Sequence, residues 1–153
     1  MIESIQISPI ALASNSSFIT LSTDSIRTRS ANCCNGWLQH REGSPLYQLL
    51  KCGYYDVYFK TLISSATAGS VAIGLYEDGI FDNSTLATSI ITTAGDVETL
   101  SFHTTLQVCG NGNTTIAIGS AQAIPNFIDL TGASTVTQIP IIGNSTLILK
   151  KLP

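Results

Sequence analysis

Charged residues are scarce in this sequence: they make up 11% of the 153 residues, compared with about 25% in a typical soluble domain. Seven Lys and Arg face ten Asp and Glu, so the net charge is −3. Binding to nucleic acid needs a dense positive field, which this balance does not supply. The composition therefore argues against a nucleic-acid-binding protein.

Long apolar runs are also missing. No stretch approaches the roughly 20 residues that a membrane-spanning helix needs, so we expect no membrane insertion. The first residues, MIESIQISPIALASNSS, have no basic segment and alternate in polarity from the start. A secretory signal peptide has a basic segment followed by a solid apolar block. We therefore expect a soluble chain that is made in the cytoplasm.

Catalytic motifs are absent as well. The sequence has no G-x-S-x-G elbow, phosphate-binding loop, dinucleotide fingerprint or H-E-x-x-H pair. The two histidines, His40 and His103, stand alone, and we expect ordinary solvent-facing side chains at both positions. Acidic residues cluster only around turns, without the spacing of a calcium loop. The sequence thus predicts no enzyme and no cofactor.

The four cysteines do not form a C-x-x-C motif. They are Cys33, Cys34, Cys52 and Cys109. Without a signal peptide, reduced thiols are favoured, and we expect small buried or half-buried side chains. A zinc site that combines cysteines with His40 or His103 is an open alternative, although the spacing lacks the usual zinc knuckle.

Period-two alternation is the main structural signal. In the segment GYYDVYFKTLIS, residues 53–64, every second side chain is apolar or small. Successive residues of a strand point to opposite faces, so one set should face a core: Tyr55, Val57, Phe59, Thr61 and Ile63. The alternate set, from Tyr54 to Lys60, should face outwards.

Similar segments recur along the chain and are separated by turn signals. Residues 70–77 and 96–108 alternate in the same way, and Asp78-Gly79 and Gly110-Asn111 are typical hairpin turns. Pro140 indicates an edge or a bulge near two short C-terminal strands. We expect residues 1–153 to form a single all-β domain, an antiparallel jelly roll or β-sandwich.

Residues 24–44 differ in character from the rest. This stretch carries the only tryptophan and three of the seven basic residues. Long irregular loops in compact domains are often functional, and Trp and Arg are favoured at interfaces. We expect an irregular interaction loop that contacts a capsid protein or another partner, although a loop that merely covers one end of the sandwich is the alternative. The expected contact residues are Arg27, Arg29, Trp37 and Arg41.

Three tyrosines are expected on outward faces of the predicted strands. They are Tyr54, Tyr58 and Tyr76. Tyrosines that gather on an outer sheet face suit a subunit interface, and isolated surface tyrosines are the alternative. We expect these three residues to contact a second copy of the chain.

Two resemblances rest on these segments. The stretch DSIRTRSANCCNGWLQHREGSPLY, followed by GYYDVYF, VAIGLYEDG and an AGD-x-x-x-LSF strand, resembles small structural proteins of tailed phages that infect gut bacteria. From about Leu46 onwards the chain also resembles the trimeric tumour-necrosis-factor-like jelly rolls. Their G-x-Y-x-x-x-F strand is matched by Gly53, Tyr55 and Phe59.

The resemblances imply a homotrimer that serves in a bacteriophage virion, as a head fibre or capsid decoration without catalytic activity. They imply the major capsid protein or other virion proteins as partners, and a virion location after synthesis in the bacterial cytoplasm. The alternative is a carbohydrate- or receptor-binding β-sandwich of a phage adhesion device, with host-surface or mucosal glycans as ligands.

Overall fold

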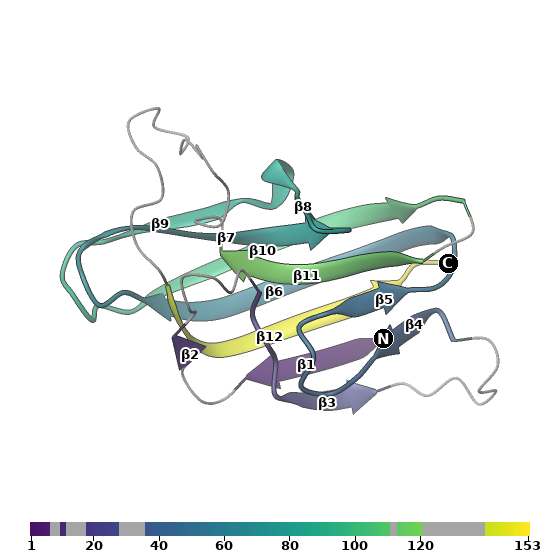
Figure 1. Ribbon diagram of the computed structural model, residues 1–153, viewed down its shortest axis with the longest axis horizontal. Coiled ribbons are helices and arrows are strands. Elements are labelled where there is room, and N and C mark those ends of the chain that lie inside the picture. Colours follow the sequence, from purple (N-terminus) through teal and green to yellow (C-terminus); the bar gives the residue numbers. More distant parts are fainter. Residues whose placement is uncertain (7–9, 12–17, 28–35, 111–112, 121–139) are drawn as a thin grey trace.

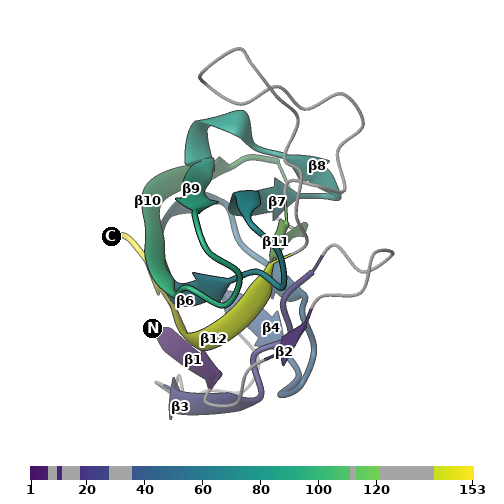
Figure 2. The same cartoon turned by 90° about the vertical axis from the view of Figure 1, so that its left-hand side faces the viewer.

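Two six-stranded antiparallel sheets lie face to face in the computed structural model (Figure 1). The structure describes residues 1–6, 10–11, 18–27, 36–110, 113–120 and 140–153. Figure 2 shows the two sheets end-on as two layers, and both termini lie at the same end of the sandwich in Figure 1. The part of the chain that is described contains no helix long and apolar enough to cross a membrane.

We call the two layers sheet A and sheet B. Sheet A has the strand order β10 (Glu98–Val108), β6 (Gly53–Ser64), β12 (Ile141–Lys151), β1 (Ile2–Gln6) and β3 (Thr23–Arg27), with β2 (Ile10–Ala11) paired to β12. Sheet B has the order β4 (Leu38–His40), β5 (Tyr47–Leu49), β11 (Thr114–Ser120), β7 (Gly69–Glu77) and β8 (Ile80–Phe81), with β9 (Ala87–Ile91) paired to β7. A single 3-10 turn, η1 (Asn83–Thr85), follows β8.

The core lies between the sheets and follows the predicted alternation. Tyr55, Val57, Phe59, Thr61 and Ile63 of β6 are all 0% exposed. Strand β6 lies between β10 and β12, so both of its edges are hydrogen-bonded. Burial of each large side chain contributes on the order of 1.5–3 kcal/mol, and β6 is therefore the centre of the fold.

The C-terminal segment is one strand, which corrects the expected pair of short strands. Strand β12 continues through Gly143-Asn144 because a bulge between Ile142 and Ser145 absorbs the extra residues. A Cβ atom at position 143 would stand 3.1 Å from the Cβ of Leu62. Glycine therefore allows β12 to stay against β6 through the bulge.

Residues 24–44 are less irregular than expected. Residues up to Arg27 belong to β3, which pairs with β1, and Leu38–His40 form β4, which pairs with β5. Residues 28–35 lie outside the described residues. The sequence patterns here are too short to show period-two alternation, since β4 has only three residues.

One buried and one exposed isoleucine give a matched test of this packing. Ile63 is fully buried and Ile80 is 75% exposed. We expect Ile63→Ala to lower the free energy of unfolding by about 2–5 kcal/mol, and Ile80→Ala to change it by less than about 0.5 kcal/mol. Urea denaturation followed by fluorescence measures both, and equal effects would contradict the packing described here.

Candidate subunit and partner interface

The outer face of sheet A carries an almost continuous row of half-buried side chains. The strand register places Glu3 beside Ile148, Ile148 beside Tyr58, and Tyr58 beside His103, across four neighbouring strands. Ile148 and Tyr58 are both half-buried by their neighbours on the face. No described segment of the chain crosses over this row (Figures 1 and 2).

An acidic side chain and a histidine meet on this face. The Oδ1 atom of Asp56 lies 2.5 Å from Nε2 of His103, and the ring of Tyr58 meets the imidazole edge-on at 6.4 Å. The His103 side chain is 61% exposed, so the pair contributes at most about 1 kcal/mol in a single chain. Covering it by a second chain would remove it from water and strengthen the interaction.

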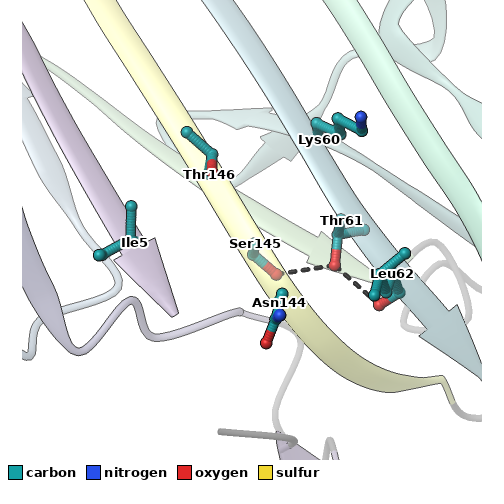
Figure 3. Close-up of a pocket in the computed structure, with 7 residues that line it drawn as sticks. All are labelled: Ile5, Lys60, Thr61, Leu62, Asn144, Ser145 and Thr146. Atoms are coloured by element: carbon teal, nitrogen blue, oxygen red, sulfur yellow. Dashed lines mark hydrogen bonds between the residues drawn. The ribbon is translucent and has the colours of Figure 1, made fainter. Parts of the chain in front are cut away.

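A depression of about 410 Å³ opens on the same face next to the bulge in β12 (Figure 3). It is lined by Ile5, Lys60, Thr61, Leu62, Asn144, Ser145 and Thr146. The hydroxyl oxygens of Thr61 and Ser145 are 2.7 Å apart, and Thr61 also donates to the Leu62 carbonyl. These buried hydroxyls are therefore satisfied within the chain, and the depression is a feature of shape on the exposed face.

Over β7, the outer face of sheet B is covered by the chain itself. Phe81 and Leu86 pack on Ala72, and the Phe81 ring lies directly above Gly74, where a Cβ atom would be 2.5 Å from its Cζ. Thr85 accepts a hydrogen bond from the Leu75 amide and holds this cover in place. The two sheets therefore differ: sheet B has an internal cover and sheet A has a bare row.

Tyr76 projects from the outer face of sheet B, as the alternation predicted, but it lies under that cover, which corrects the expectation of an accessible ring. It is 6% exposed, and the rings of Phe18 and Phe81 each meet it edge-on at 5.1 Å. Its hydroxyl donates to the Ser120 carbonyl at 2.8 Å. Tyr76 thus has little surface to offer another chain.

Tyr54 and Tyr58 do lie on the outer face of sheet A. Tyr54 is 50% exposed and Tyr58 is half-buried. Both alternate with the core residues of β6, as the sequence pattern predicted. Their role in a subunit interface stays a prediction.

Trp37 is part of the core margin, so it is not a free contact residue. Its ring is half-buried and lies 5.5 Å from the ring of Tyr55, and its carbonyl accepts a hydrogen bond from the Leu50 amide. Replacing Trp37 would disturb the sandwich as well as any partner. Arg41 is exposed. Among the three arginines predicted to contact a partner, Arg41 is the one whose side chain the structure describes. Arg27 contributes its backbone to β3, and Arg29 lies outside the described residues.

The histidines and cysteines have different surroundings from those expected. His103 is exposed, as predicted, but His40 is 7% exposed and stacks on Tyr47 with ring centroids 3.9 Å apart. Cys52 and Cys109 are exposed free thiols and not buried ones, while Cys33 and Cys34 lie outside the described residues. Within the described ranges, no three His, Cys, Asp or Glu side chains are placed to hold a metal ion.

Comparison with known proteins supports the fold and leaves the function open. No family model matches the sequence, and no curated protein matches it. The globular domain of zebrafish complement 1qA protein has a TM-score of 0.63 at 8% identity, and the match covers 99% of this chain and 96% of that chain. Murine APRIL has a TM-score of 0.56 at 11% identity, with 98% and 99% covered. Eiger TNF from S. frugiperda has a TM-score of 0.56 at 8% identity, with 99% and 92% covered.

The fold is therefore the jelly roll of the tumour-necrosis-factor and C1q-like domains, which confirms the expected all-β fold class. At 8–11% identity, these likenesses concern the fold alone.

Two tyrosines of the sandwich titrate abnormally. Burial raises the pKa of both Tyr55 and Tyr76 above the ordinary value. In the unfolded chain these hydroxyls ionise near pH 10, whereas the folded chain keeps them neutral to higher pH. The unfolded state therefore loses these protons first, and the free energy of unfolding falls as the pH rises above about 10.

We expect the double variant Tyr55→Phe/Tyr76→Phe to lose less stability between pH 9 and pH 11 than the unchanged protein does. Urea midpoints measured across this range give the comparison. Parallel curves for the two proteins would show that these hydroxyls do not cause the alkaline loss.

Proposed function

We propose that this protein is a non-catalytic, homotrimeric accessory of a bacteriophage virion, a head fibre or capsid decoration. The observation that carries the trimer is the difference between the two outer faces. The outer face of β7 in sheet B is covered by Phe81 and Leu86, whereas sheet A leaves Tyr58 and Ile148 half-buried and open to a neighbour. Such a face is completed by a second chain.

A closed ring needs a second, different surface on each chain, because head-to-tail contacts pair unlike patches. Exposed apolar side chains supply this second surface at the edge formed by β9 and the start of β10. Ile90 is 66% exposed and Val97 is 61% exposed. In the proposed trimer this edge packs against the Tyr58 row of the next chain, and the ring size of three follows from the resemblance to trimeric jelly rolls.

The virion role is supported by the resemblance of residues 24–47 and the following strands to small tailed-phage structural proteins. The capsid contact is assigned to Arg41 and the neighbouring segment, which adjoins the outer face of sheet B. This leaves the outer face of sheet A and the edge at β9 for contacts between subunits.

Light scattering of the purified protein should give a mass of about three times the 16.2 kDa of one chain. We expect Tyr58→Asp and Ile90→Asp each to yield monomer, since either change buries an unpaired charge in the ring. Ile80→Asp, a change at an exposed position of β8, should leave the trimer intact. A monomer for the unchanged protein would overturn the trimer.

The virion assignment has its own test. Antibodies against this chain should label intact particles of the phage whose genome encodes it, and the chain should be found by mass spectrometry in purified particles. Its absence from particles would contradict the virion role and leave the trimer standing.

A second candidate function is glycan binding, which is favoured by two adjoining depressions on the outer face of sheet B. One of about 400 Å³ is lined by Gln39, Gln48 and Arg41, and one of about 320 Å³ by Phe18 and the surface near Tyr76. They share Leu46 and Thr115. Amide groups beside apolar surface are suited to the hydroxyls and ring faces of a sugar.

Arg41 is the cation of this groove, so a carboxylate-bearing saccharide is the class of ligand that the groove favours. A glycan array should show hits among acidic saccharides, and Arg41→Ala should weaken the binding at least tenfold, since the loss of a charge-assisted hydrogen bond costs about 1.5–3 kcal/mol. Lys60→Ala, on the opposite layer, is the matched control. An array without hits would rule out this candidate.

A further inference from the structure

Two cysteines that are 57 positions apart in the sequence lie just beyond the same end of the ladder between β6 and β10. The ladder between β6 and β10 ends with Gly53 opposite Val108. Continued by one step beyond that pair, the same antiparallel register would put Cys52 opposite Cys109. The positions of the two cysteines thus follow from the alignment of β6 and β10 at the centre of the fold.

A direct contact supports this placement independently of the register. The thiol of Cys52 donates to the carbonyl of Gly110, which is the residue that follows Cys109. The side chain of Cys52 therefore already reaches across to the segment that follows β10. Both thiols are free, and both are exposed to solvent.

The spacing suits a covalent bond. Residues that lie directly opposite in an antiparallel pair have Cα atoms about 4.5–5.5 Å apart, and disulfides form when the Cα atoms are about 4.4–6.8 Å apart. Gly53 and Gly110 flank the two positions and have φ angles of 140° and 70°. The backbone next to the two cysteines can therefore adjust to a disulfide more easily than it could with larger residues at these positions.

We propose that Cys52 and Cys109 form an intramolecular disulfide when the folded chain meets an oxidising thiol–disulfide pool. The oxidant is a low-molecular-weight disulfide such as oxidised glutathione. One cysteine thiolate attacks it, forms a mixed disulfide and releases one molecule of glutathione. The second thiolate then attacks the sulfur of the first cysteine and releases the other. Two protons leave the cysteines, and their two electrons reduce the glutathione disulfide.

The bond would join the ends of the two strands that carry most of the exposed face of sheet A. Tyr54 follows Cys52 by two residues on β6, and His103 stands on β10. In the reduced chain, the ends of these strands beyond the last ladder pair are held only by non-covalent contacts. Oxidation would fix this end of the face without changing its register, and it would do so whether or not the chain forms a trimer.

The experiment uses the full chain with Cys33→Ser and Cys34→Ser, so that only the two cysteines of interest remain. The folded protein is incubated with oxidised glutathione, and the control sample is kept in reduced glutathione. We expect a mass loss of two hydrogen atoms and a tryptic cross-link between the peptides that contain Cys52 and Cys109. The thermal midpoint should rise by about 5–15 °C on oxidation and return on reduction.

Single variants Cys52→Ser and Cys109→Ser in the same background separate the cross-link from other effects of oxidation. Both should fold like the parent in reducing buffer, as judged by circular dichroism, and neither should gain stability on oxidation. Two free thiols after oxidation, bonds between chains on a non-reducing gel, or a cross-link to Cys33 or Cys34 in the unchanged protein would each overturn the proposal.

Discussion

The register of β6 between its two neighbours is the constraint on which the rest of the structure depends. A slip by one residue would turn Phe59 and Ile63 to solvent and bring Lys60 into the core, because side chains alternate strictly along a strand. The free-energy cost of such a slip fixes the register of β6 with both β10 and β12. The row beside Tyr58 and the opposed positions of Cys52 and Cys109 follow from the same alignment. The candidate interface and the proposed disulfide are thus consequences of how the core is packed.

The difference between the two outer faces has a local origin. Asp78 and Gly79 both have positive φ angles, which is the geometry of a tight hairpin turn. This turn sends β8 back along β7, and Asp82 then accepts a hydrogen bond from the Ser84 amide and ends the hairpin in a 3-10 turn. The result places Phe81 over Gly74, a position where a side chain would collide with the ring. A short polar turn therefore determines that the outer face of β7 is covered.

The sequence predicted the long strands β6 and β10 well, but it divided β12 into two and predicted the short or distant contacts poorly. Alternation along β6 was enough to assign Phe59 and Ile63 to the core, because the strand has 12 residues over which the period can be read. Tyr76 was placed on the correct face, but its cover was missed, because Phe18 lies far away in the sequence and the Phe81 hairpin leaves no periodic signal. The exposed thiol pair was missed for a similar reason, since a cross-strand neighbour is known only once the register is known.

Several of the few charged residues lie around Tyr58 on the outer face of sheet A. Lys60 and Asp56 lie on either side of Tyr58 along β6, and Lys150 lies beside Asp56 on β12. Apolar surface gives an interface most of its affinity, whereas charges at the margin mainly select the partner and its orientation. A half-buried tyrosine between charged neighbours is therefore suited to a contact that forms in only one register. The bare face of sheet A has this arrangement, and the face of sheet B, whose apolar residues are already buried by its own hairpin, does not.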